Sequence, residues 1–369
     1  MGRHLVLVGG GHAHMETLAN VRRLVKRSHR VTVIGPSATH YYSGMGPGLL
    51  GGTYTAAEIR FATRRIVEGQ GGRFVRGAVR RIDPKRRVLF LDTGATVSYD
   101  IASFSVGSVV RRDTVHVENS TVFPVKPIET LIRARDHIRD ASAERRLRVA
   151  VVGGGPAAAE IAGNVVHLLR RGANHRPTIE IFSGDRFMDA ASEAAGRRVA
   201  RHLARQNVTI SEHDPVTTVR NNRIETKSGR SCDVDITFLA VGISPTPIFG
   251  LSELPIGPDG GLLVNRYLQS PAHPELFGGG DCIYFADHPL AKVGVHAVRE
   301  NPILYHNLTA ALEERPLRPF TPRNGYLLIL NVGEFGVLRR RRFIVAGSAV
   351  MRVKDSIDRR FMRRYQALE

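Results

Sequence analysis

Cysteine occurs only twice among the 369 residues of this chain, as Cys232 and Cys282. The two thiols are far apart in sequence, so they give neither a disulfide framework nor the spacing of metal ligands. The sequence therefore predicts no metal site, and it favours a reducing, cytoplasmic compartment.

Long apolar runs are also absent. The N-terminal run from Leu5 to Val8 ends at Gly9, far short of a signal-peptide core, and no later stretch nears the roughly 20 apolar residues that a membrane-spanning helix needs. We expect a protein that is cytoplasmic, or cytoplasmic and peripherally bound to the inner face of the cell membrane.

Acidic residues are fewer than basic ones: 34 Asp and Glu stand against 53 Lys and Arg, which gives a formal net charge of +19. Such an excess favours an anionic partner, such as a membrane surface or nucleic acid, or reflects a basic solvated surface. The sequence has no recognisable nucleic-acid-binding module and few aromatic residues among the basic ones, so we expect no nucleic acid.

Glycine, in contrast, is abundant at 37 residues, and it marks two similar segments. Each segment has an apolar strand, three successive glycines, a helix and a second strand. These elements fall at residues 3–8, 9–11, about 12–26 and 30–34 in the first copy, and at 148–152, 153–155, 156–171 and 178–182 in the second. Two β-α-β units of this kind predict an α/β protein that binds two dinucleotides.

The glycines have a steric role in this prediction. The first glycine of each trio, Gly9 or Gly153, permits a tight turn. The third, Gly11 or Gly155, lets the main chain approach a pyrophosphate, and the helix N-terminus that follows offers unpaired N–H groups to its charge.

Another residue replaces the last glycine of the G-x-G-x-x-G pattern in both copies. Ala158 is a small substitute in the second copy, whereas the bulk of His14 in the first predicts looser packing of its helix on the sheet. His12 and His14 are two residues apart and do not share a helix face, so we expect packing or local hydrogen bonding from them and no joint metal site.

Three further segments resemble the flavoproteins with two dinucleotide-binding domains, the pyridine nucleotide-disulfide oxidoreductase superfamily. Residues 276–282, Leu-Phe-Gly-Gly-Gly-Asp-Cys, resemble the second FAD motif, and by this match Asp281 hydrogen-bonds the ribityl chain of the flavin. Residues 99–107 and 234–245 resemble the crossover motifs that close each domain.

Within this superfamily the chain resembles the branch of type II NADH dehydrogenases and sulfide:quinone oxidoreductases, and especially a subgroup associated with selenide, water dikinase. The segments that carry this likeness are residues 9–14, 42–45, 125–128, 291–295, 297–299 and 354–362.

The resemblance implies two nested Rossmann-like domains, each a three-layer α/β sandwich, and a small C-terminal α+β segment. Residues 1–114 and 248–318 are expected to bind FAD, and the inserted residues 115–247 to bind NAD(P). Residues 319–369 are expected to form an interface or to face a membrane.

The C-terminal segment has its own pattern. Residues 326–332, 336–338 and 343–346 are typical of short antiparallel strands, with four arginines at 339–342 in a hairpin. Apolar residues then recur at helical spacing among arginines, at Val350, Val353, Ile357, Phe361, Tyr365 and Leu368. This basic amphipathic helix either lies on an anionic membrane or packs on the protein's own core or on a second copy in a homodimer.

The resemblance implies an FAD-dependent NAD(P)H dehydrogenase with NADH or NADPH as co-substrate. Disulfide reductases and sulfide:quinone oxidoreductases of this superfamily need cysteines beside the flavin. Since this chain lacks such cysteines, we expect a quinone or a similar non-protein acceptor. The alternative is a flavin-binding accessory or redox-sensing protein that acts through a partner, with a link to selenium metabolism.

The family match also assigns site residues. Those expected to bind FAD are Gly9, Gly11, His12, Ser43, Val79, Gly107, Lys126, Asp281, Val293 and Gly294. Those expected to bind NAD(P) are Gly153, Gly155, Ala158, Glu160, Ser183, Arg186 and Gly242.

Three residues are candidates for catalytic roles. By the match, Glu160 lies near the nicotinamide, and Lys126 and Lys292 reach the flavin ring. A helix from Val293 to about Leu312 is predicted to point its N-terminus at the flavin, where it would stabilise negative charge.

Specificity for NADH or NADPH depends on the residue that ends the second strand of the nicotinamide unit, where an acid favours NADH and an arginine favours NADPH. Here that residue is Ser183, followed by Asp185 and Arg186. The sequence therefore allows either NADH or NADPH as the hydride donor. The corresponding residue of the FAD unit is Gly35, which also lacks the usual acid.

Overall fold

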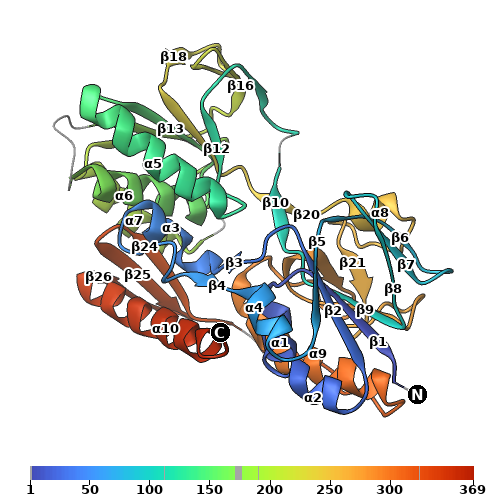
Figure 1. Ribbon diagram of the computed structural model, residues 1–369. Helices are drawn as coiled ribbons and strands as arrows, with labels where there is room; N and C mark the ends of the chain where they lie inside the picture. Colours follow the sequence, from blue (N-terminus) through green and yellow to red (C-terminus); the bar gives the residue numbers. More distant parts are fainter. Residues whose placement is uncertain (1, 112, 171–176, 190, 324) are drawn as a thin grey trace.

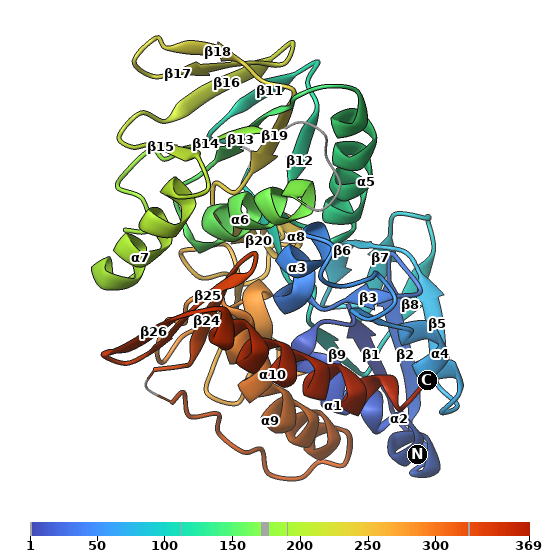
Figure 2. The ribbon, with the colours of Figure 1, turned by 90° about the vertical axis from the view of Figure 1, so that its left-hand side faces the viewer.

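The computed structural model describes residues 2–111, 113–170, 177–189, 191–323 and 325–369. Figure 1 shows two lobes, each built around its own sheet. Figure 2 shows the C-terminal hairpin and helix running along one side of both lobes.

The first sheet is parallel throughout. Its strands, in spatial order, are β22 (Leu276–Gly278), β9 (Ile101–Phe104), β1 (His4–Val8), β2 (Arg30–Gly35) and β5 (Arg73–Arg76). The central strands β1 and β9 are buried along their whole length, as in sheets covered on both faces. Because β22 follows the whole second lobe in sequence, the two lobes are nested along the chain.

The second sheet is also parallel. Its strands are β12 (Val122–Pro124), β19 (Ile236–Leu239), β13 (Arg148–Val152), β14 (Thr178–Phe182) and β15 (Val208–Ser211), and the helices of this lobe are α5 (Glu129–Glu144), α6 (Pro156–Arg170) and α7 (Glu193–Ala204). The Ser192 hydroxyl caps α7 by accepting a hydrogen bond from the Ala195 amide. The α/β fold with two parallel sheets is therefore confirmed.

The first helix differs from the prediction of one element at residues 12–26. It is divided into η1 (His12–His14), α1 (Met15–Ala19) and α2 (Val21–Lys26). Asn20 interrupts it, because this residue leaves helical geometry at φ −118° and its side chain donates to the Glu16 carbonyl at 2.8 Å.

The prediction of loose packing at His14 is wrong. The side chain is fully buried, its Nδ1 lies 2.7 Å from the Gly9 carbonyl and its Nε2 lies 2.8 Å from the Ser103 hydroxyl. His14 therefore fastens the glycine turn to β9 by hydrogen bonds that a third glycine could not make.

The remaining elements are short, apart from α9. The helices are η2 (Ser43–Met45), α3 (Gly46–Leu50), α4 (Thr63–Glu68), α8 (Ile248–Leu251), η3 (Gly280–Cys282) and α9 (Gly294–Leu312). The strands are β3 (His40–Tyr41), β4 (Arg60–Phe61), β6 (Val79–Asp83), β7 (Val88–Leu91), β8 (Thr96–Ser98), β10 (Ser108–Val110), β11 (His116–Glu118), β16 (Val216–Arg220), β17 (Arg223–Thr226), β18 (Ser231–Asp233), β20 (Ile243–Pro245), β21 (Leu262–Val264) and β23 (Ile283–Phe285). The antiparallel pair β10 and β20 carries the chain between the lobes.

The C-terminal segment is an antiparallel sheet followed by a helix, as predicted. The strands are β24 (Leu328–Val332), β25 (Phe335–Arg340) and β26 (Phe343–Gly347), and α10 spans Ser348–Gln366. Arg339 and Arg340 end β25, and Arg341 and Arg342 form the turn to β26. No helix in the described ranges is long and apolar enough to cross a membrane.

The predicted apolar stripe of α10 is only half correct. Val350 and Tyr365 are buried, but Val353 and Ile357 are 47% and 46% exposed. The buried face instead carries Lys354 and Asp358, which form an ion pair one helical turn apart. Helical spacing alone does not show whether two charged residues one turn apart form a buried ion pair or face solvent.

Strand β24 packs directly on α6 at Gly163, where there is no room for a side chain. A Cβ on Gly163 would lie 2.5 Å from Val332 Cγ1 and 2.7 Å from its carbonyl carbon. Beside this contact, the Asn164 side-chain amide donates to the Asn331 carbonyl at 2.9 Å. The close approach fixes the C-terminal segment against the second lobe.

We predict that Gly163→Ala destabilises the protein by about 1–3 kcal/mol, because the added methyl group forces β24 away from α6. Gly250→Ala on α8 is the matched control, since its Cβ would meet nothing nearer than 3.6 Å. Thermal unfolding midpoints of both variants test this, and a Gly163→Ala midpoint at or above that of Gly250→Ala would contradict it.

Candidate functional site

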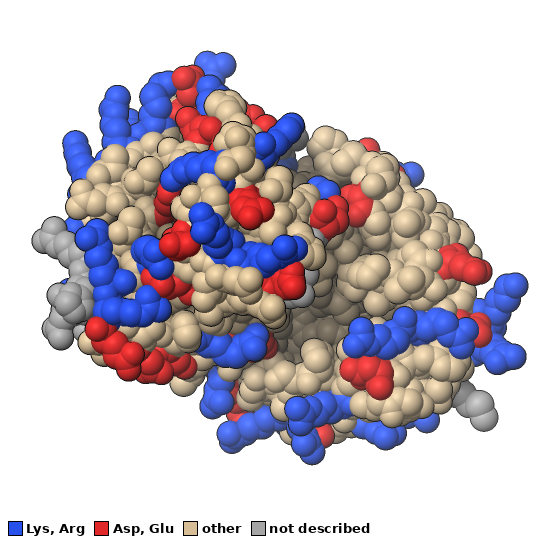
Figure 3. All heavy atoms as spheres, turned by 90° about the horizontal axis from the view of Figure 1, so that it is seen from above, with Lys and Arg blue, Asp and Glu red and all other residues tan. Residues whose placement is uncertain are grey.

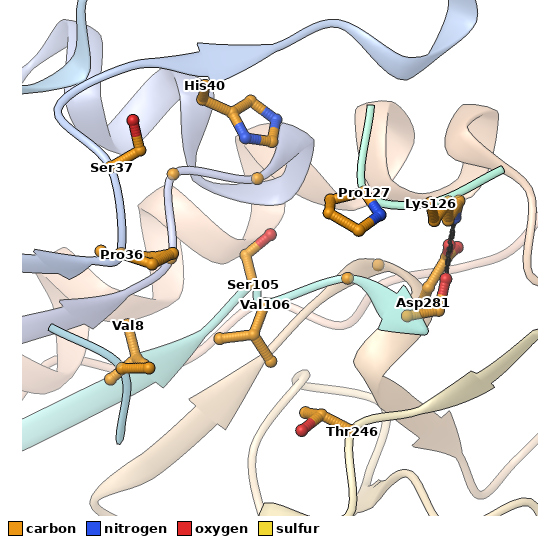
Figure 4. Close-up of a pocket in the computed structure, with 18 of the residues that line it drawn as sticks. Val8, Pro36, Ser37, His40, Ser105, Val106, Lys126, Pro127, Thr246 and Asp281 are labelled. Atoms are coloured by element: carbon orange, nitrogen blue, oxygen red, sulfur yellow. Dashed lines mark hydrogen bonds and ion pairs between the residues drawn. The ribbon is translucent and has the colours of Figure 1, made fainter. Parts of the chain in front are cut away.

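A cavity of about 440 Å³ opens at the carboxyl ends of the first sheet (Figure 4). The glycine turn after β1, the loop after β2 and the loop after β9 form its walls, and the start of α9 closes one end. This edge of a parallel sheet is where open α/β folds place their ligands. Of the residues expected to bind FAD, all except Val293 line it, and Val293 is the N-cap of α9 beside Gly294.

The glycine turn is held tightly by the loop after β9. Gly9 has a φ of +85°, and a Cβ there would lie 2.4 Å from the Ser105 carbonyl oxygen. A Cβ on Gly11 would lie 2.4 Å from Ser105 Oγ, and the Gly11 amide donates to the Ser105 carbonyl at 3.2 Å. A side chain at either position would collide with Ser105, so the packing of the protein requires both glycines whether or not a ligand binds.

Asp281 belongs to a hydrogen-bonded cluster at one end of the cavity. Lys126 Nζ lies 2.9 Å from Asp281 Oδ2 and 2.8 Å from Ser108 Oγ, and Ser108 Oγ donates to the same carboxylate at 2.8 Å. Burial opposes ionisation of Asp281, but the charge and hydrogen bond of Lys126 outweigh it, so the pKa of Asp281 falls below its usual value. The carboxylate is therefore ionised at neutral pH.

Lys292 lines the same cavity, but other groups engage its ammonium. Its Nζ lies 2.8 Å from Asp259 Oδ2 and also donates to the Ile283 carbonyl. Two residues later, Gly294 begins α9 and lines the cavity, so the helix predicted from Val293 to Leu312 is confirmed and its N-terminus lies at the cavity wall.

Glu160 lies outside this cavity, at the contact of α6 with the C-terminal segment. Its Oε1 accepts a hydrogen bond from the Asn331 amide at 2.8 Å. Burial raises the pKa of Glu160 to about 7, against smaller opposing effects of the Asn331 hydrogen bond and the Lys354 charge. Its predicted place beside the nicotinamide stays a prediction.

The other residues expected to bind NAD(P) surround the second glycine turn. Gly153 has a φ of +126°, and a Cβ there would lie 2.2 Å from the Ala240 carbonyl oxygen. A Cβ on Gly155 would meet nothing within 4 Å, so open space faces this glycine. Ala158 is fully buried and Gly242 has a φ of +90°. Gly155 therefore faces more open space than Gly11, its counterpart in the first turn.

The two residues considered for donor specificity differ in exposure. Ser183 is 2% exposed, and its Oγ lies 1.8 Å from where a Cβ on Gly154 would be. The Arg186 side chain is 54% exposed and lies 3.2 Å from Asp189. Arg186 is thus available to an incoming phosphate, whereas Ser183 is packed beneath the turn.

His40 is the main site residue that the sequence did not indicate. It lines the cavity from β3, and its ring centroid lies 5.8 Å from that of His12. A lone histidine in a short strand carries no motif, and only the fold brings it near the glycine turn. Within the described ranges, no three His, Cys, Asp or Glu side chains gather as metal ligands would.

Residues 3–307 match the family described as Pyridine nucleotide-disulphide oxidoreductase. The chain belongs to this family. Together with the cavity and the two glycine turns, this makes the protein an FAD-dependent oxidoreductase that acts on NAD(P)H.

Known relatives are distant in sequence. The chain is 25% identical over 291 residues to ferroptosis suppressor protein 1 of Taeniopygia guttata, covering 72% of each protein. It is 25% identical over 329 residues to the Type II NADH:quinone oxidoreductase NdhA of Mycobacterium tuberculosis, covering 78% of this chain and 68% of that one. The sulfide:quinone oxidoreductase of Aquifex aeolicus has the same fold, with a TM-score of 0.82 at 16% identity over 100% of this chain and 92% of that one.

The residues of the cavity fit FAD. The tight turn at Gly9–Gly11 presents main chain to the cavity, and an ionised acid, Asp281, stands at one end. His12 and His40 also line the cavity, but their Nε2 atoms are shielded from solvent and therefore do not face its open space.

We predict that stability falls as pH is lowered below about 6.5. Burial lowers the pKa of four histidines to about 3 or 4, and raises that of two glutamates to about 7; they are His4, His12, His14, His40, Glu160 and Glu300. Between about pH 4.5 and 6.5, unfolding binds four protons to the histidines and releases two from the glutamates. These six groups alone give a net uptake of about two protons, so they lower the free energy of unfolding by roughly 2.7 kcal/mol for each unit by which the pH is lowered.

Urea unfolding between pH 5 and pH 6.5 measures this slope. Glu300→Gln removes one opposing group while keeping an acceptor for the Gly280 amide, so its slope should be steeper by about one proton. Unfolding free energies that stay flat across this range would show that the histidines are not held neutral.

Proposed function

We propose that this protein is an NAD(P)H dehydrogenase that passes electrons through FAD to a quinone or a similar small acceptor. In this proposal residues 1–114 and 248–318 bind FAD, residues 115–247 bind the nicotinamide dinucleotide and residues 319–369 form an interface. The observation that carries it is a dinucleotide cavity that ends at an ionised acid, with no reactive thiol beside it.

The cysteines support a non-protein acceptor. Cys282 is fully buried next to Asp281, its Sγ lies 3.4 Å from the carbonyl oxygens of Phe104 and Gly279, and burial raises its pKa to about 12. Cys232 lies on β18 of the other lobe, and burial raises its pKa too. Since the thiolate is the reactive form, neither cysteine is suited to relay electrons from a flavin.

FAD, when bound, accepts hydride from NAD(P)H and delivers the electron pair to the acceptor. The protein would position the cofactor and set the electrostatic potential around it. The N-terminus of α9, at Gly294, brings positive potential to the cavity, which stabilises negative charge there. The Lys126–Asp281 pair adds an ordered donor and acceptor at the same end.

The first test is anaerobic mixing of the purified yellow protein with NADH or NADPH in a stopped-flow instrument. We expect the flavin absorbance to bleach with at least one donor, and to recover when a soluble quinone is added. Arg186→Ala should weaken NADPH use severalfold and leave NADH use unchanged, because Arg186 is the exposed cation beyond β14.

Absence of bleaching with both donors would contradict the proposal. Slow bleaching without turnover by any quinone would instead favour the second hypothesis, a flavin-binding accessory or redox sensor that acts through a partner, such as one in selenium metabolism.

We further propose that the C-terminal segment binds the anionic inner face of the cell membrane, where a lipid-soluble quinone would be met. Four large apolar side chains on β26 and α10 are exposed, namely Phe343, Val345, Val353 and Ile357. Exposed arginines lie beside them in the chain, at positions 340–342, 352, 360 and 363. On the face seen in Figure 3, Lys and Arg are interspersed with Asp and Glu.

Pelleting with phosphatidylserine-containing vesicles tests the membrane proposal. The double variant Arg341→Glu, Arg342→Glu should reduce binding at least tenfold, since each basic residue near such a surface contributes about 1 kcal/mol. Arg359 and Arg364 are unsuitable targets because they pair with Glu58 and Glu16.

The control is Arg23→Glu, Lys26→Glu, which makes the same charge change on α2. Equal loss in both double variants, or no pelleting of the parent protein, would contradict membrane binding. A protein that does not pellet and is dimeric by light scattering would assign the patch to a homodimer instead.

A further inference from the structure

A second cavity, of about 940 Å³, adjoins the FAD cavity. Its described lining comes from five segments, which are residues 109–113 on and after β10, 124–127 at the end of β12, 243–247 on and after β20, 258–259, and 290–292 before α9. Val109, Lys126, Pro127 and Lys292 line both cavities, so the two spaces share a wall. This wall lies near Asp281 and the start of α9, at one end of the FAD cavity.

The walls of the second cavity are mostly apolar and stiff. Five prolines line it, namely Pro124, Pro127, Pro245, Pro247 and Pro258. Val110, Ile243 and Leu290 add aliphatic surface. Proline has a fixed φ and no N–H donor, so these walls offer a defined shape and few hydrogen bonds. Mostly apolar cavities of about 300–1,000 Å³ with a few polar groups are typical of small-molecule sites.

Every cation in the described lining of the second cavity is paired with a carboxylate. The N–O distances are 2.9, 2.9 and 2.8 Å in the pairs Arg111–Asp113, Lys126–Asp281 and Lys292–Asp259. A phosphate or another anion would therefore have to break an ion pair in order to find a counter-charge. The cavity is suited to a neutral ligand instead.

Lys292 keeps one hydrogen-bond donor for such a ligand. A lysine ammonium has three N–H donors, and among the described residues Lys292 uses two, on Asp259 and on the Ile283 carbonyl. Its side chain is 17% exposed, so a ligand can reach the ammonium. Leu290 and Ala291, which precede it, line the second cavity and not the first, whereas Lys292 itself lies at the shared wall.

We propose that the second cavity is the acceptor site and that it takes a compact quinone, one carbonyl oxygen of which accepts the remaining hydrogen bond from Lys292. This inference rests on the proposed function, because it gives the acceptor of that reaction a place. None of the described lining residues belongs to the C-terminal segment 319–369, so the inference does not depend on the proposed membrane contact.

The chemistry of a quinone fits these groups. Reduction to the quinol takes up two electrons and two protons and converts both carbonyl groups to hydroxyls. NAD(P)H supplies the two electrons and one proton as a hydride, by way of the flavin, and water supplies the second proton. The Lys292 ammonium would stabilise negative charge on the quinone oxygen until that proton arrives.

Binding of 1,4-naphthoquinone to the oxidised, FAD-loaded protein tests the site without turnover. Ala291→Phe and Ser244→Phe each place a ring in the second cavity, from different segments, and each should weaken binding about tenfold in isothermal titration calorimetry. Ala286→Phe is the matched control, because Ala286 is exposed in the same loop as Ala291 and lines neither cavity.

Naphthalene, which has the same rings without the carbonyl oxygens, tests the hydrogen bond. The parent protein should bind naphthoquinone about tenfold more tightly than naphthalene, because a hydrogen bond from a charged donor is one of the stronger kind. Lys292→Met should remove this preference and leave naphthalene binding in place. An unchanged preference in Lys292→Met would contradict the assigned role of Lys292.

Stopped-flow kinetics separate this inference from the proposed function. Ala291→Phe and Ser244→Phe should slow re-oxidation of the reduced protein by naphthoquinone and leave bleaching by NAD(P)H unchanged. Slower bleaching with unchanged re-oxidation would assign the cavity to NAD(P)H and overturn the inference, as would undiminished naphthoquinone binding or an equal loss in Ala286→Phe. Failure of NAD(P)H to bleach the parent protein would overturn the proposed function, whereas the binding measurements would still decide whether the cavity holds a quinone.

Discussion

The ion pair between Lys126 and Asp281 joins the parts of the chain that make the cavity. Lys126 follows the first strand of the second sheet, Asp281 lies in η3 where the chain has returned to the first lobe, and Ser108 at the start of β10 bonds to both. A partly buried pair with a satisfied third partner is costly to break from one side only. The three parts of the chain therefore meet at one polar contact, which holds one end of the cavity together.

The C-terminal helix extends this arrangement to the outer surface. On its buried face, Asp358 accepts a hydrogen bond from the Tyr42 hydroxyl at 3.3 Å and Lys354 donates to the Gly44 carbonyl at 2.7 Å. Phe361 stacks on Tyr42 at 4.8 Å, and Tyr42 in turn contacts His12 of the cavity. The same helix exposes apolar and basic side chains on its other face, so one element connects the cavity wall with the surface proposed to meet the membrane.

Much of the fold follows from local sequence rules, and the exceptions have physical reasons. Glycine trios after apolar strands predicted both parallel sheets, because few other residues allow that turn. The break at Asn20 depends on a side chain that competes for a helical carbonyl, and the tight packing of His14 depends on partners from other strands. Glu160 and His40 acquire their surroundings only from tertiary contacts, which no spacing in the sequence encodes. Motifs therefore located the cavity, whereas the environment of each side chain required the structure.

A crystal structure of the protein with FAD bound would show where the cofactor lies and which side chains hold it. We predict the cofactor in the cavity at the carboxyl edge of the first sheet, with its pyrophosphate at the Gly9–Gly11 turn. Its ribityl hydroxyls should lie within hydrogen-bond distance of Asp281. Flavin bound elsewhere, or a cofactor that does not reach Asp281 and leaves it bonded only to Lys126 and Ser108, would contradict this assignment of the site.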